Sequence, residues 1–334
     1  MNSETRLRID TVSGQINSVR FAELSRSSHN VRMAGNNCVK TCVILNPAAG
    51  TAKNFDKLTE RFAQHGFTDL RLTKKSGDAE RFARAAVRRG CDLVVSAGGD
   101  GTLNEVVNGV AKHARDISVG IVPLGTGNDF ARSLDLPNEF EAAIQIVKKG
   151  RRKAVDLVRV KSNSDRVRYF VNVSAGGFSG LVDEKLTPEI KRSWGPLAYL
   201  RSAAAALPAL RAYKTEIKLS GRKRLVYSSY NIIIANGRYV AGGIAIAPKA
   251  RLDDGLLDII LIPELPAAEI AILVAQILIG KHLSNKSIVF HRAARVAVKS
   301  KPGMWFNVDG ELVGNEPAVF EIMPRGIHFM VGKK

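Results

Sequence analysis

The chain has 334 residues, of which 45% are hydrophobic, so it can form ordinary cores and is not globally disordered. A chain of this length suits two domains. Its formal net charge of +19 favours a polyanionic partner, such as nucleic acid, an anionic membrane or a phosphorylated ligand. The alternative interpretation is that the charge only keeps the protein soluble.

The first 38 residues are polar and mixed in charge, which predicts a flexible extension and not a signal peptide. The three cysteines, Cys38, Cys42 and Cys91, lack the spacing of a disulfide framework or a zinc site. Reduced thiols are typical of the cytoplasm, and we expect the protein there.

Apolar runs and helical patterns alternate from about residue 39 to residue 135. Strands are predicted at Val43–Leu45, Leu70–Thr73, Leu93–Ser96 and Val119–Val122, and helices at Asn54–His65, Asp78–Arg89 and from Leu103 onward. This alternation predicts an α/β domain in which a buried parallel sheet is covered by helices on both faces.

The pattern changes after about residue 152. Strands are predicted at Val155–Val160, Val167–Val173, Glu216–Leu219, Tyr227–Ala235, Leu257–Ile262, Arg295–Val298 and Phe320–Ile322. Many strands and few helices indicate an antiparallel sandwich. The most apolar segment, Ile262–Gly280, is interrupted by prolines and polar residues, so a packed helix is expected there and not a membrane span.

A glycine cluster, Gly98-Gly99-Asp100-Gly101-Thr102, follows the third strand and precedes a helix. Such a turn lets the backbone approach a phosphate at the positive end of the helix, although a purely structural turn has the same form. Asp100 inside it is a candidate for holding Mg²⁺, for accepting a hydroxyl proton, or for capping the helix.

Two more loops of small and polar residues follow predicted strands, at Asn46-Pro47-Ala48-Ala49-Gly50 and at Pro123–Asp129. Ligands of parallel sheets bind beyond the carboxyl ends of the strands, so these loops and the glycine cluster are expected to line one crevice. Farther on, Asp253–Asp258 predicts a cation site or a turn. Asp309-Gly310-Glu311 predicts a general base or a solvated loop.

Together these motifs resemble the diacylglycerol kinase catalytic-domain family, and within it the bacterial lipid kinases related to sphingosine and ceramide kinases. The resemblance runs from residue 40 to the end. It rests on Asn46-Pro47-x-x-Gly50, Thr73 before Gly77-Asp78-Ala79, Gly98–Glu105, Pro123–Phe130, Asn172–Phe178, Asn236-Gly237, Gly242-Gly243, Pro248–Asp258 and Asp309-Gly310-Glu311.

The resemblance implies an α/β ATP-binding domain at residues 39–151, to which residues 323–334 return, and a β-sandwich domain at 152–322. It implies that ATP is bound by Asn46, Pro47, Ala48, Ala49, Gly50, Thr73, Gly98, Gly99, Asp100, Gly101, Thr102, Leu103, Asn104, Glu105 and Thr126. Asp254 would organise Mg²⁺ with the backbone carbonyls of Arg251 and Leu256, which requires the Arg251 side chain to point away. Glu311 would be the general base beside Asp309, with Asp100 as another candidate.

The resemblance further implies transfer of the γ-phosphate of ATP to a lipid hydroxyl, as in diacylglycerol, with ceramide, a sphingoid base or NAD as alternative acceptors. A lipid substrate implies peripheral binding at an anionic membrane surface, where Leu197–Leu210 would face lipid or form an ordinary core helix. A homodimer is also compatible with the family. Nucleic acid is disfavoured as a partner because the basic residues are not accompanied by an aromatic stacking surface. A basic module that senses nucleotide without catalysis is the remaining alternative.

Overall fold

The computed structural model of the chain describes residues 39–50, 55–162, 167–177, 210–220, 224–309, 311–314 and 317–333. The predicted extension at residues 1–38, the apolar segment 197–210 apart from Leu210, Phe178, Gly310 and the side chain of Glu311 lie outside the described residues. The chain divides into two compact units. The first comprises the described residues up to Gly125, Leu136–Lys153 and those from Ile327 onward, and the second comprises Thr126–Asp135 and Ala154–Gly326.

The first unit is built on a parallel sheet in the order β2-β1-β3-β4-β15. The strands are β1 (Thr41–Leu45), β2 (Leu70–Leu72), β3 (Leu93–Gly98), β4 (Ser118–Pro123) and the end of β15 (Ala318–Val331). Every residue of β3 and β4 is buried, as expected for strands that are covered on both faces.

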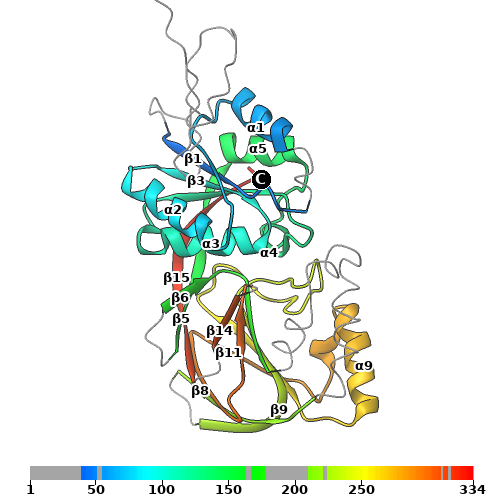
Figure 1. Ribbon diagram of the computed structural model, residues 1–334. Helices are drawn as coiled ribbons and strands as arrows, with labels where there is room; N and C mark the ends of the chain where they lie inside the picture. The colour runs from blue at the N-terminus through cyan, green and yellow to red at the C-terminus, as the bar shows by residue number, and fades with distance from the viewer. Residues whose placement is uncertain are drawn as a thin grey trace, which may run out of the picture. The chain divides into compact units, whose positions relative to one another are not determined.

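Helices cover both faces of this sheet, as Figure 1 shows. One face carries α1 (Phe55–Gln64) and α5 (Phe140–Lys149), whose Phe62 and Ile144 are fully buried in a core with alternate strand residues. The other face carries α2 (Asp78–Arg88) and α3 (Asp100–Val110), which is followed by the short helix η1 (Ala111–His113). The predicted α/β architecture is therefore confirmed, although α3 begins three residues before the predicted start.

The second unit is an antiparallel sandwich. Its strands are β5 (Arg151–Ser162), β6 (Val167–Phe170), β7 (Val173–Gly177), β8 (Tyr213–Leu219), β9 (Arg224–Ala235), β10 (Leu257–Pro263), β11 (Val289–Ala293), β12 (Arg295–Lys301), β13 (Phe306–Val308), β14 (Glu311–Gly314) and the beginning of β15. The long strand β9 joins the two layers, because its first half pairs with β8 and its second half lies between β7 and β10. Phe170, Ile232 and Phe320 belong to the core that the layers share.

The predicted strand Val167–Val173 is wrong as a single element. The chain bends at Val171 and Asn172, so that β6 pairs with β5 whereas β7 pairs with β9 and β13. The Asp309 carboxylate accepts hydrogen bonds from the N–H groups of Val171 (3.2 Å) and Val173 (2.9 Å) at this bend. A side chain far along the chain therefore holds the bend that separates these two strands.

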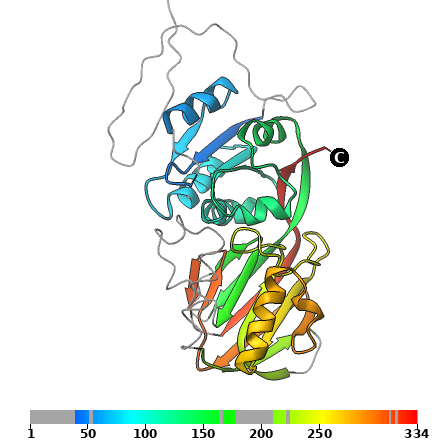
Figure 2. The ribbon, with the colours of Figure 1, turned by 90° about the vertical axis from the view of Figure 1, so that its right-hand side faces the viewer.

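Helix α9 (Ala267–Leu278) lies along the outside of the antiparallel strands, as Figure 2 shows. It packs near a second core that includes Ile233, Ala247 and Ile260, and the short helix η3 (His282–Ser284) follows it. Among the described residues, no helix is long and apolar enough to cross a membrane.

Candidate active site

The glycine cluster forms the junction between β3 and α3. An ideal Cβ at Gly98 would lie only 2.5 Å from Thr102 Oγ1, and one at Gly99 would lie 3.2 Å from Gly125 Cα. These distances leave no room for a side chain at Gly98 and little at Gly99. Gly99 is the N-cap residue and Asp100 is the first helical residue, so the interpretation of Asp100 as the helix cap is wrong.

The Asn46 loop is joined to this junction by hydrogen bonds. The Asn46 backbone N–H donates to Ala97 O (2.9 Å), and its side-chain Nδ2 donates to Thr102 Oγ1 (3.1 Å). The remaining side-chain atom, Oδ1, accepts the N–H of Ala48 (2.9 Å) and closes a tight turn. The Asn46 side chain therefore fixes its own loop and the first turn of α3 together.

The end of β4 reaches the same edge of the sheet. The Leu124 N–H donates to Gly98 O (2.9 Å), and Gly125 is the residue against which Gly99 packs. The loops after β1, β3 and β4 thus meet within the first unit, as their place beyond parallel strands predicts. Thr126, which is exposed, begins the segment that groups with the second unit.

Glu105 and Thr73 connect this edge to α2. One Glu105 carboxylate oxygen accepts the N–H of Gly77 (2.9 Å), and the other accepts the N–H of Ala79 (2.9 Å). The Thr73 N–H donates to Leu45 O (3.0 Å), and its side chain is buried. Gly77 has a φ of +86°, which favours glycine. Glu105 therefore holds the beginning of α2.

Asp78 is a buried carboxylate that the sequence analysis noted only as part of a motif. Burial would raise its pKa, but hydrogen bonds from the N–H groups of Lys74 (2.9 Å) and Lys75 (3.1 Å) and from Arg81 outweigh burial and lower the pKa. Asp78 consequently remains ionised and fixes the turn that follows Thr73.

Leu103 and Asn104 are both buried within α3. Asn104 accepts hydrogen bonds from Asn108 Nδ2 at its side-chain oxygen and at its carbonyl, both at 2.9 Å. Their side chains therefore stabilise the helix. The N–H groups of Gly101 and Thr102 precede the first intrahelical bond, which runs from Leu103 N–H to Gly99 O (3.1 Å). They lie at the positive end of the helix, where anions bind.

The second unit brings three carboxylates together at a turn, and two of them pair with one guanidinium. Arg292 pairs with Asp254, and its Nε donates to Asp258 Oδ1 (2.8 Å). Burial raises the pKa of Asp258, and the nearby charge of Asp254 raises it further against the opposing effect of Arg292. Asp258 Oδ2 is buried and has no hydrogen-bond partner among the described residues.

Asp156 is the third carboxylate and is fully buried in β5. It accepts the N–H of Gly255 (2.7 Å), in the turn next to Asp254, and the N–H of Arg325 (2.7 Å). Burial raises the pKa of Asp156, the two N–H groups oppose this, and Asp254 and Asp253 add to it. Neither Asp156 nor Arg292 was predicted from the sequence as a member of this cluster. The signal for Asp156 was a carboxylate between the apolar residues Val155 and Leu157 of a predicted strand.

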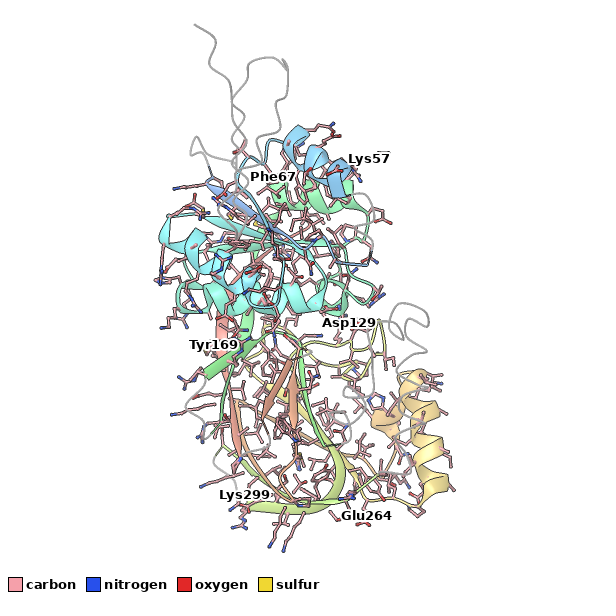
Figure 3. The ribbon with its side chains drawn as sticks, viewed as in Figure 1. Lys57, Phe67, Asp129, Tyr169, Glu264 and Lys299 are labelled. Carbon is pink, nitrogen blue, oxygen red and sulfur yellow. The ribbon has the colours of Figure 1, made fainter. Side chains whose placement is uncertain are left out.

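The segment Thr126–Asp135 is held within the second unit by polar contacts of α4 (Asp129–Ser133). Asp129, labelled in Figure 3, accepts the N–H of Gly242 at Oδ2 (3.0 Å). Arg238 donates to Ser133 O (2.8 Å) and to Asp135 Oδ1 (2.9 Å). The resemblance motifs Asn128-Asp129 and Gly242-Gly243 therefore meet at one contact, although they are far apart in sequence.

Asp309 lies in the turn between β13 and β14, with a φ of +46°. Both of its carboxylate oxygens accept backbone N–H groups, as described for the bend between β6 and β7. Glu311 is the first residue of β14, where its backbone pairs with Val308. Asp309 therefore positions the turn that carries Glu311.

Comparison with known proteins agrees with this architecture. A family model described as the diacylglycerol kinase catalytic domain matches residues 40–160, and one described as the YegS C-terminal NAD kinase beta sandwich-like domain matches residues 172–331. The diacylglycerol kinase of Bacillus subtilis strain 168 is 32% identical over 299 residues, which cover 87% of this chain and 96% of that protein. The chain belongs to the diacylglycerol kinase family. It is therefore a lipid kinase.

Two further relatives support this membership of the diacylglycerol kinase family. The diacylglycerol kinase of Staphylococcus carnosus strain TM300 is 32% identical over 284 residues, covering 83% of this chain and 90% of that protein. The crystal structure of a diacylglycerol kinase from Bacillus anthracis strain Sterne superposes with a TM-score of 0.69 at 26% identity, covering 88% of this chain and 97% of the other.

The residues that the diacylglycerol kinase resemblance assigns to Mg²⁺ can be compared with this structure. Among the described residues, no group of three or more His, Cys, Asp or Glu side chains is arranged to hold a metal ion directly. The Arg251 guanidinium is 70% exposed and lies 3.9 Å from the Asp253 carboxylate, so it does not need to face a cation. Two carboxylates, Asp254 and Asp258, share one guanidinium, and Asp258 Oδ2 has no hydrogen-bond partner among the described residues, which fits a hydrated Mg²⁺ held through few protein oxygens.

Proposed function

We propose that this lipid kinase transfers the γ-phosphoryl group of ATP to the primary hydroxyl of diacylglycerol, giving ADP and phosphatidate. The relatives that share about a third of its residues are named diacylglycerol kinases. The observation that carries the ATP half of the proposal is the meeting of three loops at the beginning of α3, where Gly98 and Gly99 admit no bulky side chain.

The phosphates of ATP would lie over the N–H groups of Gly101 and Thr102, because a helix N-terminus and a bare backbone stabilise negative charge. Asn46–Gly50, Thr73 and Thr126 would contact the rest of the nucleotide. Glu105, Leu103 and Asn104 would contribute indirectly. Glu105 holds the beginning of α2, and the other two are buried in α3.

Glu311 is our candidate for the general base that removes the hydroxyl proton, which then remains on its carboxylate. Asp309 would serve as its positioning residue, since both Asp309 oxygens accept backbone N–H groups. Asp100, at the beginning of α3, is the second candidate base. Replacing Glu311 with Gln should lower kcat by roughly 10²–10⁴-fold if Glu311 is the base, and Asp100→Asn tests the second candidate in the same way.

Asp254 and the backbone carbonyls of Arg251 and Leu256 would hold Mg²⁺, with Asp156 and Asp258 supplying further negative charge. When bound, the ion would neutralise negative charge and order the surrounding loops. Arg292 keeps the carboxylates of Asp254 and Asp258 in place. Chelation of the metal should therefore abolish phosphoryl transfer, and added Mg²⁺ should restore it.

The substrate would lie in a bilayer, so the enzyme would work at the cytoplasmic surface of an anionic membrane. Its net charge of +19 supports this location, because each basic residue near an anionic surface contributes about 1 kcal/mol.

The test is phosphorylation by the purified chain with labelled ATP and Mg²⁺. Diacylglycerol, ceramide, a sphingoid base and NAD are offered separately, followed by a total lipid extract. We expect labelled phosphatidate and loss of the label in Asp100→Asn or Glu311→Gln. Preferential labelling of ceramide, a sphingoid base or NAD would replace the proposed acceptor, and absence of any labelled product with Mg·ATP would refute the proposal.

A further inference from the structure

The outward side of α9 is apolar except for Glu269 in its first turn, which is exposed. Ala268, Ala271 and Ala275 are exposed, and so are Ile272 (56%), Leu278 (45%) and Ile279 just beyond the helix (65%). These residues recur at intervals of three and four, so they form one face, which we call the α9 outer face. A helix of a soluble domain ordinarily presents polar side chains on this side.

The opposite side of α9 accounts for its packing and for its polar residues. Leu273 is buried, and Ile277 packs against the core that includes Ile260. The helix contains only two polar residues, Glu269 and Gln276. Ser287 Oγ donates to Glu269 (3.3 Å) and Asn285 Nδ2 donates to Gln276 (2.8 Å). Both polar groups are therefore bonded to the following loop, and Glu269 remains exposed beside the apolar residues of the α9 outer face.

The charge that follows this face along the chain is basic, while Glu264 and Glu269 are exposed carboxylates at the beginning of the helix. From Ile270 to Val308 the chain contains no Asp or Glu, and Lys281 and Lys286 are the first basic residues of this stretch. Lys281 and Lys286 directly follow the helix and are exposed. An apolar face next to lysines matches the interface of an anionic bilayer, in which apolar side chains enter the acyl boundary and lysines remain among the head groups.

We propose that the α9 outer face is a membrane-docking surface that inserts shallowly into an anionic lipid bilayer, with Lys281 and Lys286 at the head groups. The inference rests on the proposed function in one respect, since a kinase whose acceptor is a membrane lipid must remain at the bilayer surface. A second copy of the chain would also cover an apolar face, but it would place like charges of the two loops together.

The first measurement is co-sedimentation with vesicles of phosphatidylcholine containing phosphatidylglycerol. The variant is Ile272→Ser with Ile279→Ser, and the matched control is Val226→Ser, an exposed apolar residue on β9 (48%). We expect the double variant to lose roughly tenfold in vesicle affinity per isoleucine, and the control to bind as the unaltered chain does. Unchanged binding of the double variant would overturn the proposal.

A second variant tests the same face without removing a large side chain. Ala275 is exposed, so Ala275→Glu adds a carboxylate that is hydrated in the free protein but must be desolvated or repelled at an anionic bilayer. It should weaken vesicle binding at least as much as the double variant while leaving the melting temperature unchanged. Lys281→Ala with Lys286→Ala should weaken binding only to vesicles that contain phosphatidylglycerol.

Activity and oligomeric state separate this proposal from its alternatives. The Ile272→Ser/Ile279→Ser enzyme should lose activity on vesicle-embedded diacylglycerol but retain it on diacylglycerol dispersed in detergent micelles. If no lipid is phosphorylated in micelles while vesicle binding still depends on the α9 outer face, the proposed function fails and the docking surface stands. If sedimentation velocity shows a dimer that the double variant dissociates, with vesicle binding unchanged, a second copy covers the face and the docking proposal is wrong.

Discussion

Gly98 and Gly101 lie three residues apart in the glycine cluster, yet the structure predicts opposite consequences for their replacement by alanine. A Cβ at Gly98 would lie 2.5 Å from Thr102 Oγ1 and 2.7 Å from Thr102 Cβ, whereas a Cβ at Gly101 would meet no atom within 4 Å. Thr102 is a short branched side chain on the first turn of a buried helix, so it cannot move aside without moving α3 or breaking its hydrogen bond with Asn46.

The expected cost of Gly98→Ala follows from this overlap. Overpacking of a well-packed site costs about 1–3 kcal/mol, and for a domain of this size each kcal/mol lowers the melting temperature by about 2–4 °C. We therefore expect a decrease of about 2–12 °C for Gly98→Ala. Gly101→Ala should leave the melting temperature unchanged or raise it slightly, because alanine is up to about 1 kcal/mol better than glycine in a helix.

The same pair separates folding from nucleotide binding. If the N–H groups of Gly101 and Thr102 receive phosphate, a methyl group at residue 101 obstructs the phosphate without disturbing the fold. Calorimetry of unfolding and titration with ATP would measure the two quantities on both variants. The reasoning is refuted if Gly98→Ala melts like the unaltered chain, and the phosphate assignment is refuted if Gly101→Ala binds ATP with unaltered affinity.

Three further predictions concern charged groups that hold loops. Glu105→Ala should lower the free energy of unfolding by about 1–2 kcal/mol, since the N–H groups at the beginning of α2 lose their acceptor. Asp78 has a lowered pKa, so its ionised form stabilises the fold above pH 3.8, and this contribution is lost as pH falls through the lowered pKa. The loss of unfolding free energy in Asp78→Asn should therefore be full at pH 7 and vanish in acid. Arg292→Met should cost about 2 kcal/mol at pH 8, a value reduced for the partial exposure of the guanidinium. Because the pKa of Asp258 is raised, its ionised form destabilises the fold as pH rises through that pKa, and Arg292 opposes this effect. The stability deficit of Arg292→Met should therefore be largest at high pH and shrink towards pH 4, where Asp258 becomes protonated.

Chemical denaturation across pH 3–8 measures all three changes. Glu105→Gln is the matched control for Glu105→Ala, because an amide retains one acceptor, and it should lose less. An Asp78→Asn deficit that grows in acid, or an Arg292→Met deficit that is largest in acid, would contradict the assigned directions of the pKa shifts.

Much of the architecture could be predicted because it depends on local patterns. Buried parallel strands read as continuous apolar runs, and amphipathic helices repeat their apolar residues every three or four positions. The placement of Asn46, Gly98 and Leu124 at one edge also followed from the sequence, since the carboxyl ends of parallel strands lie at the same edge. These features need only the order of elements along the chain.

The partner of a buried polar group, in contrast, was decided only by the tertiary structure. The sequence placed Glu105 among the residues expected to bind ATP, whereas both of its oxygens accept N–H groups of α2. The sequence also indicated Asp254 as a residue of the Mg²⁺ site. It did not indicate that Arg292 pairs with Asp254, because such pairs depend on which strands become neighbours. The glycine, strand and helix patterns are local, because they depend on the steric limits of single residues and on the spacing of apolar residues along the chain. Hydrogen bonds between distant segments, and the exposure of the α9 outer face, depend on long-range packing that no local pattern encodes.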